Sequence, residues 1–480
     1  MNRRQFLKFT AGTALIAALP GLVLGAEKPP DKRPNFIFIL IDDMGWTDSG
    51  CYGSGFYETP NIDRLAAQGM RFTNAYAASP VCSPTRMSIL AGKYPARVNL
   101  TEWIGPDEWH ARGKLTPAEY IRQMPLEEVT MAEALKAAGY TTCFVGKWHL
   151  GNEAYYPEHQ GFDINIGGLH YGWPPGGYFP PYENEKLKDG PEGEYLTDRL
   201  TDESLKFLHA NRSKSFLLYL SHYAVHNPQQ ARQYLIEKYK TKAENLPAHT
   251  GPRFIPEEKN QARQVQDDPV YAAMIHSVDD SVGRIMNKLD DSGLADNTVV
   301  IFMSDNGGLS TAEGSPTSNV PLRAGKGWLY EGGIREPMII KWPGVTKPGS
   351  ICHEPVTSTD FYPTMLDIAG LPQQPNQHVD GLSLVPLLRK TGGIKRKALY
   401  WHYPHYSNQG GPPGGAVRVG DYKLIEFYED SRVELYNLKD DVSEKHDLSA
   451  TMSQKAAELR RMLHKWKKTV DAHMPKPKPE

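Results

Sequence analysis

The chain has 480 residues and a formal net charge of −2, with 23% charged and 40% hydrophobic residues. This is the composition of an ordinary globular protein, and its charge balance offers no basic surface for a nucleic acid. The length exceeds what one small core requires, so we expect one large and one smaller domain. Four scattered cysteines without a C-x-x-C pair argue against a disulfide framework and against a zinc site.

The first 26 residues have the features of a bacterial export signal. Paired Arg3 and Arg4 stand before Phe6-Leu7-Lys8, and a mildly apolar stretch occupies residues 9–24. This arrangement resembles a twin-arginine signal, so we expect the twin-arginine export machinery to carry the folded protein to the periplasm or out of the cell. An uncleaved membrane anchor is the alternative. A proline-rich tether over residues 27–34 follows, and we expect no stable membrane span once the signal is removed.

Four apolar runs along the chain end abruptly in polar, reactive side chains. They occupy residues 35–41, 141–145, 215–220 and 298–303, and they lead into Asp42-Asp43, Lys147 with His149, His222 with His226, and Asp305-Asn306. Continuous apolar runs of this length are typical of strands that are buried on both faces. Because ligands bind at the carboxyl ends of such strands, we expect these side chains to converge on one pocket.

Helical patterns alternate with these strands. They cover residues 59–69, 129–138 and 271–289, which predicts a wound α/β domain over residues 35–390. Two long segments interrupt the alternation. The aromatic, glycine-rich segment 167–181 is expected to form a pocket wall, and the polar segment 229–266 a solvated excursion.

Beyond residue 390 the pattern changes to short alternating strands. They lie at residues 416–419, 422–427 and 433–438 and are followed by a helical pattern over 453–470. This order predicts a small α+β domain over residues 391–474. The last residues, 475–480, alternate proline with lysine and are expected to be disordered.

A short motif at residues 82–86 is the most informative feature of the chain. Cys82-Ser83-Pro84-Thr85-Arg86 has the form C-x-P-x-R and leads into an apolar helical pattern, so Cys82 is predicted to stand where a helix begins. Free backbone N–H groups at that end of a helix favour anions. A half-buried structural cysteine is the alternative interpretation.

Six motifs in a fixed order carry a resemblance to a known family. They are Ile41-Asp42-Asp43-Met44-Gly45, the pentapeptide at Cys82, Gly146-Lys147-Trp148-His149-Leu150-Gly151, Ala224-Val225-His226-Asn227-Pro228, Ser304-Asp305-Asn306-Gly307-Gly308, and Gly325-Lys326-Gly327 with Glu331-Gly332-Gly333-Ile334-Arg335. From Asn35 to about His464 the chain resembles the formylglycine-dependent, arylsulfatase-like sulfatases of the alkaline phosphatase superfamily.

The resemblance implies both a fold and an activity. The expected fold is an α/β domain of the alkaline phosphatase type, with a central mixed, mostly parallel sheet flanked by helices, plus a small C-terminal α+β domain with an antiparallel sheet and a helix. The expected activity is that of a sulfuric ester hydrolase.

The resemblance also implies that Cys82 is modified. In the family a formylglycine-generating maturation enzyme oxidises this cysteine to formylglycine, an aldehyde that is hydrated in the active enzyme. A sulfated aldehyde hydrate can expel sulfate by re-forming the aldehyde, so water does not have to attack sulfur a second time. Arg86 would hydrogen-bond the hydrate and counter its charge.

By the same resemblance, one divalent cation is bound by four side chains together with an oxygen of modified Cys82. The four are Asp42, Asp43, Asp305 and Asn306. All are hard oxygen donors, which favour Ca²⁺ or Mg²⁺ over zinc or copper, and Ca²⁺ is the expected ion.

Two lysines and two histidines complete the catalytic set. Lys147 and Lys326 are expected to counter the negative charge that develops during transfer. His226 is the candidate acid that protonates the leaving alcohol, and His149 the base that deprotonates the hydrate. His222 is the alternative to His226, which is preferred because it stands just before the turn at Asn227-Pro228.

The substrate is predicted from aromatic and histidine side chains. His170, Trp173, His402 and His405 suit a sulfated carbohydrate, because ring faces stack on sugars and hydroxyls need hydrogen-bond partners. We expect an exo-acting sulfatase for galactose or N-acetylgalactosamine sulfate. Packing of these aromatics at a domain interface is the alternative role. The alternatives for the whole protein are a phosphonate or phosphodiester hydrolase of the same superfamily and a glycan-binding protein whose cysteine is never converted.

Overall fold

The computed structural model describes residues 33–105 and 113–478. The predicted signal, most of the tether and the last two residues lie outside this part. The residues from Pro34 onward form one compact unit, so the predicted boundary between residues 390 and 391 stays a prediction.

A nine-stranded sheet forms the centre of this unit, in the order β11-β2-β10-β9-β1-β6-β4-β5, with β12 also pairing with β2. Its strands are β1 (Asn35–Ile41), β2 (Met70–Tyr76), β4 (Thr141–Gly146), β5 (Ile164–Ile166), β6 (Phe216–Ser221), β9 (Thr298–Ser304), β10 (Arg335–Lys341), β11 (Ser350–Cys352) and β12 (Val356–Thr357). Strand β10 is antiparallel to both its neighbours, and the remaining pairs are parallel. The expected mixed, mostly parallel sheet is confirmed.

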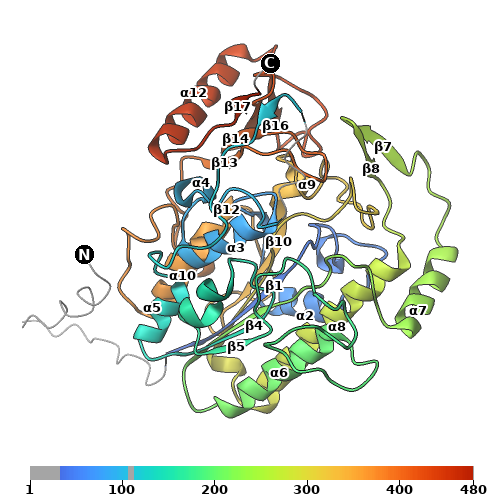
Figure 1. Ribbon diagram of the computed structural model, residues 1–480, viewed down its shortest axis with the longest axis vertical. Helices are drawn as coiled ribbons and strands as arrows, with labels where there is room; N and C mark the ends of the chain where they lie inside the picture. The colour runs from blue at the N-terminus through green and yellow to red at the C-terminus, as the bar shows by residue number, and fades with distance from the viewer. Residues whose placement is uncertain (1–32, 106–112, 479–480) are drawn as a thin grey trace, which may run out of the picture. The chain divides into compact units, whose positions relative to one another are not determined.

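Helices cover both faces of this sheet (Figure 1). The helices before the small sheet are α2 (Pro60–Gln68), α3 (Cys82–Ala91), α4 (Pro95–Val98), α5 (Met131–Ala137), α6 (Leu196–Ala210), α7 (Gln233–Glu244), α8 (Pro269–Asp291), α9 (Glu331–Ile334), α10 (Phe361–Ile368) and α11 (Val385–Leu388), of which α7 packs on α8. Short 3₁₀ turns are η1 (Gly50–Tyr52), η3 (Glu153–Tyr155), η4 (Pro157–His159), η5 (Ala295–Asn297) and η6 (Ser358–Asp360).

The continuous apolar run of β1 follows from this burial on two sides. Phe36, Phe38 and Leu40 belong to a core that includes residues of α3, α5 and α10. The intervening residues, of which Ile37 and Ile39 are examples, belong to a second core with α2, α6 and α8. Since successive side chains of a strand point to opposite faces, the positions of β1 from Phe36 to Ile41 are all apolar.

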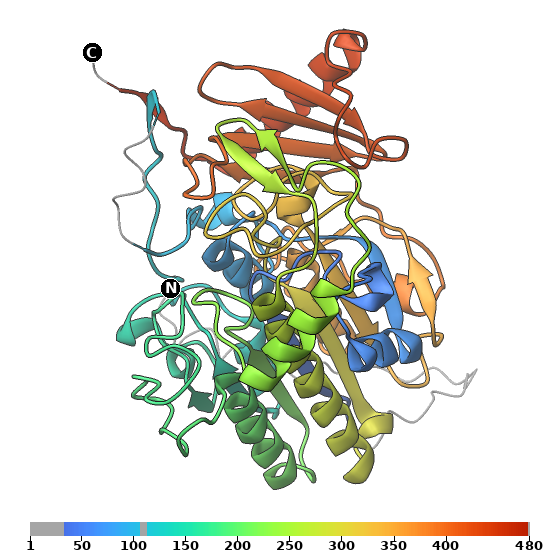
Figure 2. The same cartoon turned by 90° about the vertical axis from the view of Figure 1, so that its right-hand side faces the viewer.

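A second, four-stranded antiparallel sheet follows near the C-terminus (Figure 2). It consists of β13 (Leu399–Tyr403), β14 (Gly414–Val419), β15 (Tyr422–Phe427) and β16 (Val433–Asn437), and α12 (Ser453–Thr469) covers one face. The other face packs against residues 324–334, among them Trp328 and Tyr330. Buried Lys423 also joins this sheet to α9, because its Nζ pairs with Glu331 at 3.0 Å, and it pairs with Glu444 at 2.9 Å.

Two segments expected to be irregular contain regular structure. The segment 229–266, predicted as a solvated excursion, contains α7 and a hairpin of β7 (Phe254–Glu257) and β8 (Asn260–Arg263), and most of its residues are exposed or half-buried. The expected disordered tail contains β17 (Lys476–Pro477), which pairs with β3 (Leu115–Thr116). Backbone pairing of this kind needs no apolar side chains, so the polar sequence gave no sign of it. Among the described residues, no helix combines the length and apolarity that crossing a membrane requires.

Candidate active site

The predicted side chains gather at one edge of the large sheet. Strands β1, β4, β6 and β9 are mutually parallel, and the register aligns Leu40 with Ser221, Ile41 with Ser304, and Gly146 with Ser221. The residues that follow these strands therefore emerge side by side.

Four oxygen-bearing side chains form the floor of this site, and all are fully buried. They are Asp42, Asp43, Asp305 and Asn306. The Asp43 amide donates to Asp305 Oδ1 at 3.2 Å, and Asn306 Nδ2 donates to Asp43 Oδ1 at 2.7 Å. Asp42 Oδ1 and Asn306 Oδ1 have no hydrogen-bond partner among the described residues. Buried oxygens rarely stay unpaired, so this donor set fits a hard divalent cation.

Three cationic side chains pair with the three carboxylates, and Arg86 reaches two of them. Lys147 Nζ lies 2.5 Å from Asp42 Oδ2, and Lys326 Nζ lies 2.8 Å from Asp43 Oδ2. Arg86 Nε donates to Asp305 Oδ2 at 2.9 Å. Burial in pairs of this kind holds the charges at fixed positions.

The pKa values of the Asp42 and Asp43 carboxyls depend on burial, which raises them, and on the neighbouring cationic side chains, which lower them. Burial raises the pKa of Asp42, and the neighbouring carboxylates add to the effect of burial, while Lys147 opposes it. Burial acts in the same direction on Asp43, but Lys326 and His226 outweigh it and lower the pKa of that carboxyl. A bound cation would favour the ionised form of both.

Cys82 is the first residue of α3, where the sequence placed the start of a helix, and its side chain is 3% exposed. Its Sγ lies 3.3 Å from His149 Nδ1. Burial raises the pKa of the thiol, although Lys147 and Lys326 oppose this. An unmodified Cys82 is therefore held as a neutral thiol, which is a weak nucleophile.

Backbone groups of two other segments fix the orientation of His149. Its Nε2 lies 2.7 Å from the carbonyl oxygen of Ile104, which can only accept, so Nε2 carries the proton and Nδ1 faces Cys82 as an acceptor. A Cβ at Gly172 would lie 2.5 Å from Cε1 of His149, so the loop 167–181 closes directly on this ring. Both contacts are made by the backbone, so the residue types of Ile104 and Gly172 could not predict them.

The two histidines that follow β6 have different environments. His226 Nε2 lies 3.8 Å from Asp43 Oδ2, and its Nδ1 donates to the Asn227 carbonyl at 2.9 Å. Burial and the Lys326 ammonium lower the pKa of His226. His222 is fully buried and lies 2.9 Å from Ser281 Oγ of α8. The geometry thus places His226, and not His222, beside the acidic cluster.

Arg86 bonds to several groups of the protein, and its expected hydrogen bond to the hydrate stays a prediction. In addition to Asp305, it donates through Nη1 to the Lys147 carbonyl at 2.8 Å and to Ser221 Oγ at 2.7 Å. The guanidinium thus ties α3 to the ends of β4 and β6. Its contacts are those of a group that holds the site together.

The predicted substrate residues fall into two groups. His170 and Trp173 are exposed, with Trp173 39% exposed, and lie on the loop that closes on His149. His402 and His405 are buried. His402 bonds to Tyr428 Oη at 2.7 Å and to the His473 carbonyl at 2.9 Å, and His405 bonds to Thr101 Oγ1 at 2.8 Å. The prediction that these two contact substrate is wrong, because their rings pack inside the protein and bond within it.

Sequence reasoning also missed Glu313. This residue has a φ of 54° and accepts hydrogen bonds from Asn227 Nδ2 at 3.1 Å and from Asn408 Nδ2 at 2.7 Å. It therefore stands next to the histidine loop although it lies outside all six motifs.

Comparisons with known proteins agree on one family. The sulfatase family model matches residues 34–371, and the model of the N-sulphoglucosamine sulphohydrolase C-terminal region matches residues 324–471. A protein of Formosa agariphila named sulfatase is 36% identical, over 88% of this chain and 86% of its own length. N-acetylgalactosamine-6-sulfatase of Mus musculus is 34% identical, over 86% of this chain and 76% of its own length.

A solved structure agrees as well. The crystal structure of Ps i-CgsB in complex with k-i-k-neocarrahexaose superposes with a TM-score of 0.73 at 29% identity, covering 91% of this chain and 93% of that one. The chain therefore belongs to the sulfatase family and is a sulfuric ester hydrolase.

Proposed function

We propose that this sulfatase removes sulfate from carbohydrates, acting at a chain end on galactose or N-acetylgalactosamine sulfate. The observation that carries the proposal is the charge-matched cluster at the strand ends, with Cys82 Sγ 3.3 Å from His149 Nδ1. The similarity to an N-acetylgalactosamine-6-sulfatase supports the sugar, and so does the neocarrahexaose complex of the similar structure. The loop that closes on His149 supports action at a chain end, because it covers one side of the site.

The nucleophile is proposed to come from Cys82 after its conversion by a maturation enzyme. Formylglycine at this position, as its hydrate, would supply a hydroxyl in place of the neutral thiol. His149 would then accept the proton of the hydrate through Nδ1, because the Ile104 carbonyl keeps Nε2 protonated.

Charge in the site is proposed to be shared between a cation and the two lysines. Asp42, Asp43, Asp305 and Asn306 would hold the cation, for which Ca²⁺ fits the all-oxygen donors, and the ion would neutralise charge on the reacting oxygens. Lys147 and Lys326, each held by a carboxylate of the cluster, would counter the negative charge of a bound sulfate.

His226 is proposed to donate the proton to the departing alcohol oxygen. Its pKa is lowered by burial and by Lys326 in the protein alone. A bound sulfate ester brings a negative charge close to the ring, which favours the protonated form. Donation from Nε2 is possible because Nδ1 is fixed on the Asn227 carbonyl.

A substrate panel tests this proposal. Matured protein should release sulfate from galactose or N-acetylgalactosamine sulfates in preference to choline sulfate and to a phosphate diester, and a chelator should abolish the release. Good turnover of aryl or choline sulfate together with none of the sulfated sugars would contradict it.

Export through the twin-arginine machinery to the periplasm or beyond is proposed from the sequence. Changing both Arg3 and Arg4 to lysine should leave the protein in the cytoplasm, as a fractionation experiment would show. Normal export of that variant would point to another route.

A further inference from the structure

We propose that a polar pocket beside the catalytic site binds the sugar next to the sulfated one, and that this neighbouring sugar is uncharged. The inference rests on the proposed carbohydrate function and extends it from the sulfated residue to an oligosaccharide. It assigns a role to the β7–β8 hairpin, which lies outside all six motifs.

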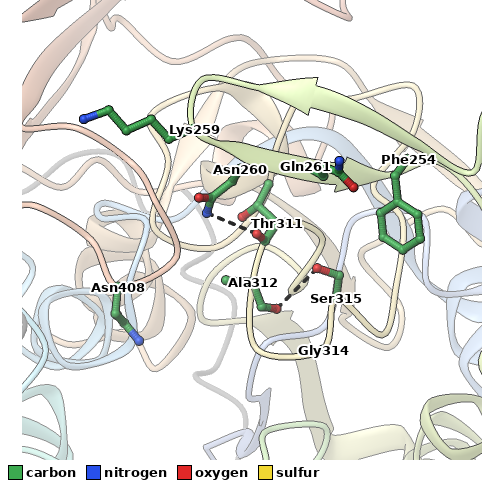
Figure 3. Close-up of a pocket in the computed structure, with 9 residues that line it drawn as sticks. All are labelled: Phe254, Lys259, Asn260, Gln261, Thr311, Ala312, Gly314, Ser315 and Asn408. Carbon is green, nitrogen blue, oxygen red and sulfur yellow. Dashed lines mark hydrogen bonds between the residues drawn. The ribbon is translucent and has the colours of Figure 1, made fainter.

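The pocket has a volume of about 540 Å³, which is within the range of ligand sites. Figure 3 shows the hairpin on one side and the loop of residues 311–315 on the other, with Asn408 from a third segment. Asn260 Nδ2 holds these walls together, because it donates to the carbonyls of Thr311 at 3.2 Å and Gln409 at 2.9 Å.

The chemistry of the lining suits a sugar. Amides and hydroxyls dominate it, and Phe254 adds a ring face that is 39% exposed. The exposed Gln261 amide makes no hydrogen bond with any described residue. A pyranose offers one apolar face for stacking and hydroxyls that bond to amides, so the two groups are complementary.

Glu313 connects this pocket to the catalytic site. Its neighbours Ala312 and Gly314 line the pocket, while its carboxylate accepts from Asn227 Nδ2 at 3.1 Å. Asn227 directly follows His226, the proposed proton donor to the leaving alcohol. Because that alcohol belongs to the carbohydrate, the part of the substrate beyond the sulfated sugar leaves the site on the side of Glu313.

The same carboxylate selects against a charged neighbour. Its oxygens accept from the amides of Asn227, Asn408 and Gln409, and it takes part in no ion pair within the described residues. An acidic group on the neighbouring sugar would lie close to this negative charge and be repelled. Lys259, the charged residue of the lining, extends away from the pocket in Figure 3.

Three substrates test the proposal on the matured full-length protein. They are galactose or N-acetylgalactosamine sulfate, whichever the panel selects, and two disaccharides in which this sugar is linked to neutral galactose or to glucuronic acid. The neutral disaccharide should exceed the monosaccharide in kcat/KM by about tenfold, as one stacked and hydrogen-bonded sugar provides, while the uronate disaccharide should not.

Variants separate the pocket from the catalytic site. Phe254→Ala with Gln261→Ala should bring the ratio of kcat/KM between neutral disaccharide and monosaccharide close to one. Tyr234→Ala, which removes a 64% exposed ring from α7, is the matched control and should keep the ratio. Glu313→Gln should raise kcat/KM for the uronate disaccharide relative to the neutral one.

The outcomes distinguish the two levels of the proposal. The enzyme could turn over sulfated sugars while the Phe254 and Gln261 changes leave the ratio of kcat/KM between neutral disaccharide and monosaccharide unchanged. That result would overturn the proposed role of the pocket and leave the proposed function standing. Equal rates on all three substrates in the wild type would do the same. Turnover of aryl sulfate without any sulfated sugar would overturn both.

Discussion

At the scale of single residues, Arg86 is the side chain on which the geometry of the site depends most. Its guanidinium reaches Asp305, the Lys147 carbonyl and Ser221 from inside α3, where it is 2% exposed. A lysine keeps the charge but cannot reproduce this planar set of donors.

We therefore expect Arg86→Lys to lower kcat/KM by about 100-fold, because a displacement of about 1 Å at the reacting groups has that effect. Steady-state kinetics on 4-nitrophenyl sulfate measures it. Arg284→Lys, at a half-exposed pair with Asp202, is the control and should behave as wild type. Full activity of the Arg86 variant would show that its contacts are dispensable.

The proton donor can be identified from the dependence on the leaving group. His226→Ala should lower kcat/KM on a sugar sulfate by at least about 100-fold, but by less than about tenfold on 4-nitrophenyl sulfate, whose departing oxygen needs little protonation. Comparing the two substrates for the same variant gives the ratio directly. A selective loss in His222→Asn instead would transfer the role to that residue.

At the scale of elements, the segment 99–105 links the small sheet to His149, the proposed base. Its Glu102 carboxylate accepts from Tyr403 Oη of β13 at 2.9 Å, and its Ile104 carbonyl lies 2.7 Å from His149 Nε2. Burial raises the pKa of Glu102 to about 8, although the Trp103 amide and Tyr403 oppose this.

This pKa predicts a pH-dependent stability. A carboxyl whose pKa is raised on folding stabilises the folded state below its unfolded pKa and loses that contribution as the pH rises toward its folded pKa. The free energy of unfolding of the wild type, relative to Glu102→Gln, should thus fall between pH 4.5 and about 8. Each pKa unit is worth about 1.4 kcal/mol.

Urea denaturation of both proteins across this pH range measures the effect. Glu192→Gln, at an exposed position, is the matched control and should give a constant difference. If the difference in free energy of unfolding between wild type and Glu102→Gln is also constant with pH, folding does not raise the pKa of the buried carboxyl, which would contradict the prediction.

The sequence predicted the elements that carry a periodic apolar pattern and failed for those that do not. The run at Asn35–Ile41 coincides with β1 because burial on both faces requires the six successive apolar residues that follow Asn35. The hairpin at Phe254–Arg263 was missed, since its backbone pairs without an apolar face.

Some features of the candidate site could likewise be predicted from the sequence, and others could not. Its charged side chains lie at predictable strand ends, whereas the contact of the Ile104 carbonyl with His149 depends on a backbone path that no residue type reveals. His402 shows the opposite error, because a histidine in a strand sequence gives no sign of whether both its nitrogens are bonded inside the protein.

At the scale of the whole molecule, buried polar contacts join the small sheet to the rest of the protein. Lys423 of β15 is fully buried between Glu331 and Glu444, and the Trp401 indole of β13 donates to the Ala77 carbonyl at 2.8 Å. Removing one member of such a cluster leaves a buried charge without its partner.

Lys423→Met should accordingly reduce the free energy of unfolding by about 3–5 kcal/mol. Urea denaturation followed by tryptophan fluorescence measures it, with the exposed Lys439→Met as the control. A loss below about 1 kcal/mol, the size typical of a surface pair, would show that the cluster is not a structural link.

The proposed chemistry of the molecule depends on the conversion of Cys82. The direct measurement is sulfate release by preparations that differ in the fraction of formylglycine at position 82, determined from the mass of the peptide that contains it. Activity should rise in proportion to this fraction and vanish in Cys82→Ala. Full activity in protein whose residue 82 is entirely thiol would contradict it.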